Sequence, residues 1–288
     1  MPSRKAIKRR AQSVTTTRQI VKAMNMVATT KLQKVKSWLQ AARPYAEESK
    51  RMLDQLKCSE QVSEHVFWSE REGVRAAYVL ITSDRGLCGS YNTNISAEAL
   101  RHMEESGREE QIITIGLKGR EYFARRGKQI LRSYQGISET AFYEDARRIA
   151  DELLTLYRSN EVDEIYVVYT HFASVLTHEP QVVRVLPVGA EANSNVDAPS
   201  DSLEMKYEPD LQAVLDYAVP AYLGAFLYSA LLESAACEQA ARMVSMEAAT
   251  KNATEIIDEL TRMYNRKRQA YITQEITEII GGAEVSGQ

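Results

Sequence analysis

The run from Ala225 to Ile280 constrains this chain more than any other stretch, because its 56 consecutive residues contain no glycine or proline. These two residues interrupt helices most strongly, so their absence over this length predicts one long helix. An unbroken helix of this length would measure roughly 84 Å. A rod of that length extends beyond any compact domain core, so another helix or a partner must cover much of it.

The charge of the chain is distributed unevenly between its two ends. Residues 1–46 hold eleven Lys and Arg and no Asp or Glu, whereas residues 204–284 hold thirteen acids against seven Lys and Arg. The formal net charge of the whole chain is only −3. Opposed charges at the two ends indicate segments that meet each other or that face different partners.

The basic N-terminal segment allows three interpretations. It resembles a mitochondrial transit peptide, a basic helix for nucleic acid or an anionic membrane surface, or one strand of a coiled coil. Its apolar residues recur every seven positions over six heptads, at Ile7, Val14, Val21, Ala28, Val35 and Ala42. A strict seven-residue repeat favours the coiled coil, since a transit peptide does not need it. Pro44 should bend or end this helix.

Between residues 75 and 188, short apolar runs alternate with helix-like segments. The runs are rich in Val, Ile and Tyr, which favour strands. The predicted strands are Ala76–Thr82, Gln111–Gly116, Ile130–Tyr134, Glu164–Thr170 and Val182–Val188. The predicted helices are Thr93–Glu105, Leu117–Arg126 and Tyr143–Arg158. This alternation predicts a mainly parallel sheet, with the last strand at an edge because Pro187 cannot donate to a ladder.

The predicted fold is therefore an α/β domain combined with a long coiled coil. We expect an N-terminal coiled-coil helix (1–58), a Rossmann-like α/β domain (74–205) that includes a polar closing loop from Gly189 to Ser202, and a C-terminal helix (208–288). The two end helices have matched apolar seams, which predicts an antiparallel pair with the α/β domain inserted between them. Pro220 should kink the second helix near its start. Part of the C-terminal helix should have no partner within the chain.

The loop from Ser83 to Ser90 follows the first predicted strand, where a dinucleotide-binding fold holds phosphate. Its glycines have the spacing G-x-x-G rather than G-x-G-x-x-G, and the chain has no P-loop motif. A structural or partner-contacting turn is therefore favoured over a nucleotide site. Cys88 has no histidine near it in sequence to act as a base, so a buried or partner-facing role is favoured over a reactive thiol.

The remaining residues give no pattern typical of an active site. The four histidines lack metal-ligand spacing, and the three cysteines (Cys58, Cys88 and Cys237) have no C-x-x-C spacing. No apolar stretch approaches the roughly 18 residues that a membrane span needs. We therefore expect no catalytic residue, no metal or cofactor site and no membrane span.

Three longer strings resemble the F-type ATP synthase γ-subunit family. They are Gln19–Lys34, which contains the sequence MNMVA, the central string Thr82–Ile95 (TSDRGLCGSYNTNI), and the C-terminal run Glu238–Ala283. The strings are long and specific, and together they extend over both end helices and the central loop. The resemblance begins within the first ten residues, from which we expect a bacterial chain, or a mature one without a leader.

The resemblance implies a central-stalk rotor subunit of a proton-translocating ATP synthase. Such a subunit transmits rotation of the membrane c-ring to the catalytic sites of a hexamer of α and β subunits, and it catalyses no bond change itself. The implied partners are the α and β subunits, the ε subunit and the c-ring, with no nucleic acid. The implied location is the cytoplasmic face of the inner cell membrane, where the chain is held as part of the complex.

The resemblance also assigns contact roles, residue by residue. The lower contacts with the β subunit are Met24, Arg85, Gly86, Leu87, Cys88 and Arg242. The upper catch is formed by Arg268, Gln269, Thr273 and Glu275. The apolar tip in the bearing is formed by Ile276, Ile279 and Ile280.

Two other classes of function remain as alternatives. One is an α/β nucleotide-binding enzyme that uses its end helices to dimerise, and the other is a basic-helix nucleic-acid binder. Binding of ATP or NAD by the isolated chain would favour the first. A DNA affinity that falls steeply with salt would favour the second.

Overall fold

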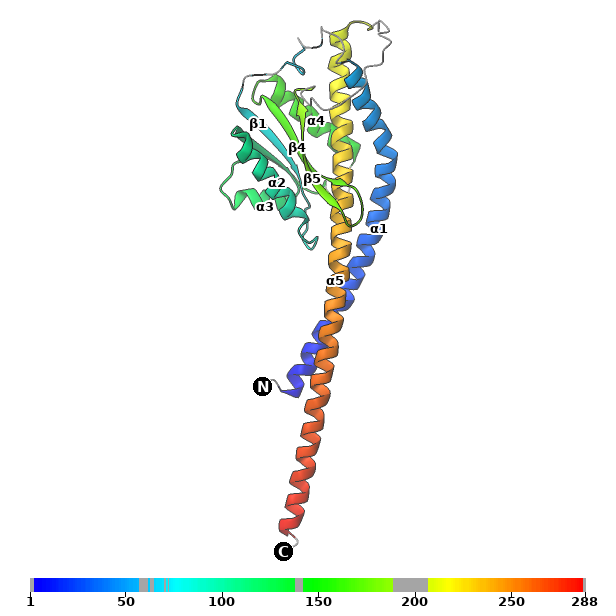
Figure 1. Ribbon diagram of the computed structural model, residues 1–288, viewed down its shortest axis with the longest axis vertical. Coiled ribbons are helices and arrows are strands. Elements are labelled where there is room, and N and C mark those ends of the chain that lie inside the picture. The colour runs from blue at the N-terminus through cyan, green and yellow to red at the C-terminus, as the bar shows by residue number, and fades with distance from the viewer. Residues whose placement is uncertain are drawn as a thin grey trace. The chain divides into compact units, whose positions relative to one another are not determined.

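A computed structural model describes residues 3–56, 62, 65–69, 71, 73–137, 142–188 and 207–286, with side chains of the last helix described as far as Ile280. The elements in chain order are α1 (Arg4–Leu56), β1 (Arg75–Ile81), α2 (Tyr91–Ser106), β2 (Glu109–Ile115), α3 (Leu117–Ala124), β3 (Ile130–Tyr134), α4 (Tyr143–Arg158), β4 (Glu164–Phe172), β5 (His178–Leu186) and α5 (Leu211–Ser286) (Figure 1). Cys58 and the loop Gly189–Ser202 lie outside the described residues.

The chain divides into two compact units. The larger unit is residues 30–241, and the smaller unit is residues 1–29 together with residues 242–288. Helices α1 and α5 each contribute a segment to both units. The three-part division at residues 58, 74, 205 and 208 stays a prediction.

The larger unit contains a five-stranded sheet in the order β3-β2-β1-β4-β5. β1, β2, β3 and β4 are parallel, and β5 pairs antiparallel with β4 at the edge. This confirms the mainly parallel sheet and the edge position of the last strand. Pro180 lies inside β5, and Pro187 follows it. An edge strand tolerates a residue that lacks an N–H, because one side of the strand has no ladder to complete.

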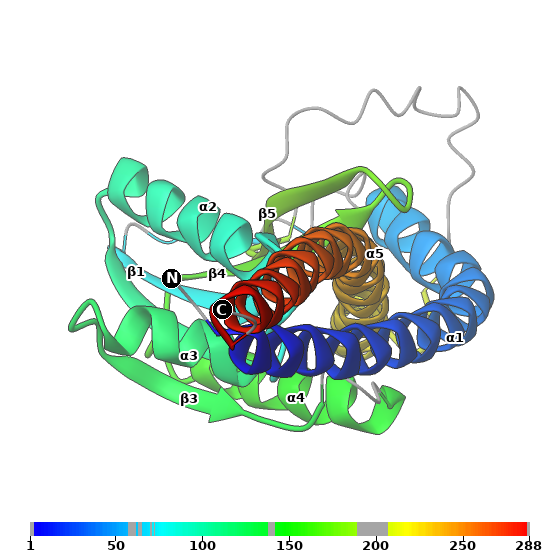
Figure 2. The same cartoon turned by 90° about the horizontal axis from the view of Figure 1, so that it is seen from below.

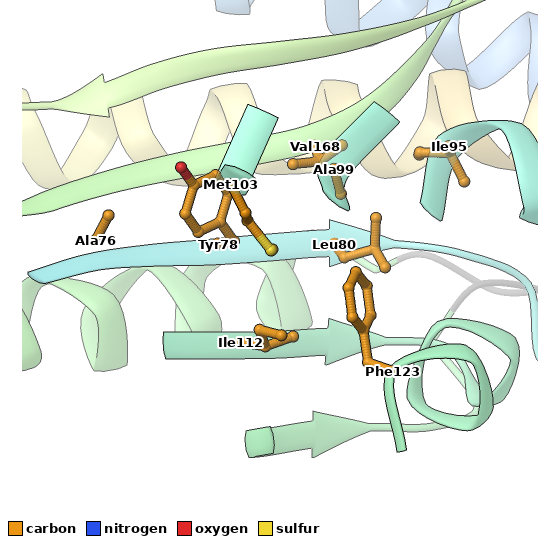
Figure 3. Packing of buried hydrophobic residues seen from close by; sticks show 9 residues of the cluster. All are labelled: Ala76, Tyr78, Leu80, Ile95, Ala99, Met103, Ile112, Phe123 and Val168. Atoms are coloured by element: carbon orange, nitrogen blue, oxygen red, sulfur yellow. The ribbon is translucent and has the colours of Figure 1, made fainter. Parts of the chain in front are cut away.

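Helices cover both faces of this sheet. Side chains alternate between the two faces of a strand, so Tyr78 and Leu80 of β1 point to one face. There they pack with residues of α2 and α3, as Figure 3 shows for Ile95, Ala99, Met103 and Phe123. Helix α4 turns its buried face toward β4 on the other side, and Figure 2 shows β1 and β4 between α2 and α4. The core of the unit therefore lies in two layers, one on each side of the sheet.

The two long helices run antiparallel within each unit. In the smaller unit Arg4 lies over the ring of Tyr271, and the side-chain amide of Asn25 donates to the carbonyl of Met243 at 2.9 Å. In the larger unit Arg43 reaches Glu233. Residue numbers rise along α1 as they fall along α5, which is the predicted antiparallel pairing.

The heptad positions of α1 lie on its covered side. Ile7, Ala28 and Val35 are buried, and Val14, Val21 and Ala42 are half-buried. The predicted seam is therefore confirmed.

The two helix prolines do not end their helices. α1 continues beyond Pro44 to Leu56, and α5 runs through Pro220. A proline inside a helix removes one hydrogen bond and strains one turn, and the packing of the rest of a long helix can offset that cost.

The expectation that no apolar stretch approaches the length of a membrane span is wrong for helix α5. One 18-residue window within Leu211–Ile280 is apolar enough to cross a membrane by length and composition. However, 61% of that window is buried inside the structure, as in the core helix of a soluble domain. Burial against the sheet and α1 accounts for its apolar composition.

We predict that Gly116→Ala destabilises the chain by about 2–4 kcal/mol, measured by urea unfolding. Gly116 has a φ of +99°, and a Cβ there would lie 2.2 Å from the carbonyl oxygen of Thr82. Gly86→Ala is the control, because a Cβ there meets no atom within 4 Å, and its stability should stay within about 0.5 kcal/mol of the wild-type value. Equal stability of the two variants would contradict the close approach of Gly116 to the carbonyl of Thr82.

Candidate partner-binding surfaces

The loop from Ser83 to Ser90 occupies the position where a doubly wound sheet usually binds its ligand. Chain order proceeds outward from β1 through β2 to β3, and then returns to β4 on the other side of β1. Ligands of such sheets bind outside the carboxyl ends of the strands at this reversal. The loop leaves the carboxyl end of β1, so it stands directly at this point.

Ser83 and Asn92 fix the first half of the loop. The N–H of Ser83 donates to Oδ1 of Asn92 at 3.0 Å, and the Ser83 hydroxyl donates to the carbonyl of Arg85 at 2.6 Å. The Asn92 amide nitrogen lies 2.7 Å from the Ser83 hydroxyl and 3.1 Å from the thiol of Cys88. These bonds determine the loop conformation before any partner is present.

Asp84 ties the loop to two other segments. Its Oδ1 accepts the N–H of Leu117 at the start of α3, and its Oδ2 accepts the N–H of Gly136 after β3, both at 3.0 Å. The next two N–H groups of α3 donate to the carbonyl of Ser83 and the hydroxyl of Thr82. Residues 82–84 therefore occupy the N-terminus of α3, which would otherwise attract an anion.

The loop presents some predicted contact residues outward and buries another. Arg85 is exposed, Gly86 is half-buried, and Leu87 is 62% exposed. Leu87 has a φ of +64°, a backbone conformation that a leucine adopts only where its surroundings determine it. Cys88 points inward and is buried beside Tyr91 and Cys237. Arg85, Gly86 and Leu87 are thus placed for contact with a partner, whereas the side chain of Cys88 is not.

Helix α5 fills the crevice beyond the carboxyl ends of β1 and β4. Cys237 of α5 packs with Cys88 and Tyr91, which follow β1. Ser234 and Glu233 of α5 contact the end of β4 through hydrogen bonds to the N–H groups of Thr170 and Phe172. The space that a nucleotide occupies in related sheets is therefore taken by a helix of the chain itself.

Met24 and Arg242 belong to the smaller unit, whereas Arg85–Cys88 belong to the larger one. Met24 is half-buried, and Arg242 is only 8% exposed. Their chain neighbours Asn25 and Met243 are hydrogen-bonded to each other. Arg242 is therefore largely enclosed by its own chain, which leaves little of its side chain for a partner.

A basic groove lies between the two helices of the smaller unit. Its volume is about 810 Å³, and its lining includes three basic residues, Arg18, Lys22 and Lys251, and one acidic residue, Glu247. Its charge favours an acidic segment of a partner over a basic one.

The C-terminal end of α5 is exposed along the whole stretch that was assigned to the catch and the tip. Arg268, Gln269, Thr273 and Glu275 are all exposed. Glu275 accepts a hydrogen bond from the hydroxyl of Tyr271, which raises the pKa of that hydroxyl.

The tip itself presents large apolar side chains to solvent. The exposed fractions of Ile276, Ile279 and Ile280 are 52%, 71% and 56%. The described residues of the chain therefore cover less than half of each of these side chains. Contiguous exposed apolar side chains are typical of surfaces that bind a partner.

A family model described as ATP synthase matches residues 3–285. The ATP synthase gamma chain of Alkaliphilus metalliredigens is 44% identical over 280 residues, which cover 96% of each chain. That of Heliobacterium modesticaldum is 41% identical over 292 residues, which cover 100% of each chain. The chain belongs to the F-type ATP synthase gamma-subunit family. It is therefore a gamma-type subunit of that assembly.

Solved rotor structures resemble this gamma-family chain as well. A chain of the central stalk and c-ring structure of the Tetrahymena thermophila mitochondrial ATP synthase has a TM-score of 0.64 at 26% identity, covering 80% of this chain and 99% of that one. A rotor chain of the Euglena gracilis enzyme has a TM-score of 0.70 at 19% identity, covering 93% and 98%. The second likeness shows the fold alone. Together they confirm the α/β domain combined with long helices.

The sequence analysis of this gamma-family chain missed the residues that fix the loop Ser83–Ser90 and those that attach α5 to the end of β4. Asp84 and Glu233 act through contacts with residues that are distant in the sequence, whereas Asn92 binds Ser83 only nine positions away. One signal was available for Glu233, a carboxylate in a run of small and apolar residues on a helix that was expected to be covered. Asp84 carried no such signal, because an aspartate in a turn is ordinary.

We predict that Asp84→Ala destabilises the chain by about 2–4 kcal/mol, because two main-chain N–H groups lose their acceptor. Asp84→Asn keeps one acceptor oxygen and should lose about half as much. Urea unfolding of the purified chain measures both. The exposed Glu104→Ala on α2 serves as the control and should change stability by less than about 0.5 kcal/mol. A wild-type midpoint for Asp84→Ala would contradict the role given to this carboxylate.

Proposed function

We propose that this chain is the rotor shaft that transmits rotation of a membrane c-ring to the catalytic sites of a hexamer of α and β subunits, with proton flow as the driving force. The chain itself catalyses no bond change in this proposal. Its partners are the α and β subunits, the ε subunit and the c-ring. It is held by this assembly at the cytoplasmic face of the inner cell membrane and has no membrane span of its own.

The observation that carries the proposal is the exposed end of α5. A chain with 40–44% identical gamma-chain relatives extends a helix whose final isoleucines, Ile276, Ile279 and Ile280, each stay more than half exposed. Exposing them costs roughly 1.5–3 kcal/mol for each large apolar side chain, relative to burial. A ring of partner subunits around the helix would supply that burial. An apolar contact has no directional bonds, so it also permits turning.

The other surfaces fit contacts of a different kind. Arg85, Gly86 and Leu87 stand on a fixed loop and would meet the lower part of the β subunit, together with Met24. Arg268, Gln269, Thr273 and Glu275 would form the polar catch. Cys88 and Arg242 contribute less to direct contact with the β subunit in this proposal, because both side chains are buried in their own chain. Their proposed role is to support the residues beside them.

The first test is co-purification. When the chain is expressed with the other subunits, we expect it to emerge with α, β and ε in one complex that hydrolyses ATP. Isolated chain dialysed against labelled ATP or NAD should retain neither, because α5 fills the crevice of the sheet. Tight nucleotide binding by the isolated chain, or a chain that never joins the complex, would reject the proposal.

The second test addresses the basic groove of the smaller unit. Combined Arg18→Glu and Lys22→Glu should lower the protons pumped per ATP hydrolysed in membrane vesicles, because attraction to acidic segments of the β subunit becomes repulsion. Both residues line the groove, and reversing them avoids disturbing the buried Arg242. Arg120→Glu with Lys118→Glu on α3 is the matched control. An unchanged number of protons pumped per ATP in the groove variant would contradict the proposed role of the basic groove.

A further inference from the structure

Strand β4 extends beyond the strand that pairs with it. The pairing of β1 with β4 ends at Leu80 and Val168, whereas β4 continues to Phe172. On its other side β4 stays paired with β5 as far as Phe172 and His178. The last residues of β4 therefore present main-chain groups on the β1 side with which β1 does not pair. Buried groups of this kind need another partner.

Three side chains of α5 take these main-chain groups, and we name Glu233, Ser234 and Cys237 the α5 latch. The hydroxyl of Ser234 accepts the N–H of Thr170 at 3.3 Å, and Oε2 of Glu233 accepts the N–H of Phe172 at 3.1 Å.

The third member of the α5 latch donates rather than accepts. The thiol of Cys237 lies 3.5 Å from the carbonyl oxygens of both Thr170 and His171. Burial raises the pKa of this thiol, so at neutral pH it keeps its proton and donates. The α5 latch thus occupies the place of a neighbouring strand.

Glu233 reaches further than the other two members of the α5 latch. Its Oε2 also lies 2.6 Å from Nδ1 of His171, and its Oε1 lies 3.6 Å from the guanidinium of Arg43 on α1. The side chain is only 8% exposed. One buried carboxylate therefore contacts β4 and α1 from its position on α5.

Directional contacts of this kind differ from the apolar packing around them. The hydrophobic contacts of a helix with a sheet are non-directional, so they do not depend on a donor–acceptor angle. A charge-assisted hydrogen bond to a main-chain N–H weakens steeply when the angle changes. The α5 latch is therefore suited to resist slipping of α5 against the sheet.

We propose that Glu233 is the positioning residue that locks α5 against β4, so that the sheet and the part of α5 packed on it turn as one body. This inference rests on the proposed rotor function. Under that function, torque that enters through the α/β layer passes into α5 at the α5 latch. Without Glu233, the sheet would move relative to α5 before it turned the helix.

The test compares Glu233→Ala with Glu233→Gln in the full chain and in the assembled complex. Hydrogen exchange read by mass spectrometry over residues 169–172 should be about 10- to 100-fold faster in Glu233→Ala. The assembled Glu233→Ala complex should hydrolyse ATP but lose protons pumped per ATP. Glu233→Gln keeps an oxygen that accepts the N–H of Phe172, so it should recover most of both properties.

Glu47→Gln is the matched control. Glu47 is an exposed acid 4.0 Å from the same Arg43, and no described contact of its side chain involves β4. Its exchange and coupling should equal those of the wild type. A loss of coupling in Glu47→Gln as large as in Glu233→Ala would overturn the proposal, because charge near Arg43 would then explain the effect.

Two other results would also overturn it. Unchanged exchange in Glu233→Ala would mean that the carboxylate does not hold β4. Faster exchange with wild-type coupling would mean that the contact stabilises the fold only locally. If Glu233→Ala yields no complex, Ser234→Ala carries the same test, because it removes the acceptor of Thr170 with little loss of volume, and wild-type coupling with faster exchange there rejects the proposal.

The exchange experiment on the full chain does not depend on the proposed rotor function. A wild-type chain that never assembles with the other subunits would defeat that function, whatever the exchange shows. A wild-type chain that assembles and pumps, with Glu233→Ala indistinguishable from it, would defeat only the α5 latch.

Discussion

The end of β4 that extends beyond β1 is the constraint on which the position of α5 in the larger unit depends. β4 continues to Phe172, beyond its last pairing with β1 at Val168, and its main-chain groups need partners that the sheet does not provide. Side chains of α5 supply those partners, so α5 must cross the carboxyl ends of β1 and β4 (Figure 1). That crossing fills the position where a doubly wound sheet usually binds a ligand. The sheet has an architecture typical of nucleotide-binding domains, but its ligand position holds helix α5 instead.

Helix α5 meets its surroundings with three kinds of chemistry along its length. In the larger unit it forms directional bonds through Glu233, Ser234 and Cys237. In the smaller unit its buried residues Met246, Ala253 and Leu260 recur every seven positions, as in a coiled-coil seam. Beyond Tyr271 it exposes isoleucines to solvent. This order fits the proposed shaft. Hydrogen bonds lie where α5 must not slip against the sheet, and apolar side chains lie where the helix must turn against its partners.

Sequence pattern predicted the elements well because the signals that set them are local. The run without glycine or proline from Ala225 to Ile280 lies within α5, and the heptads from Ile7 to Ala42 form the covered side of α1. The strands were found to within a few residues, since Val, Ile and Tyr mark them one by one. Of the two predicted effects of Pro44, bending or ending α1, the end does not occur, because the packing of a long helix offsets the loss of one hydrogen bond. Family likeness then identified the chain, because its matching strings extend over both ends.

The sequence by itself therefore determined the helices, the sheet and their family, all of which depend on periodicity and propensity over short windows. Only the tertiary structure decided which polar groups meet. It placed the carboxylate of Asp84 at the start of α3 and that of Glu233 at the end of β4, and it buried Cys88 and Arg242. Such contacts join residues that are far apart in the sequence, 62 positions for His171 and Glu233 and 218 for Asn25 and Met243. No local pattern encodes them, because a hydrogen bond depends on the distance and angle that the finished fold imposes.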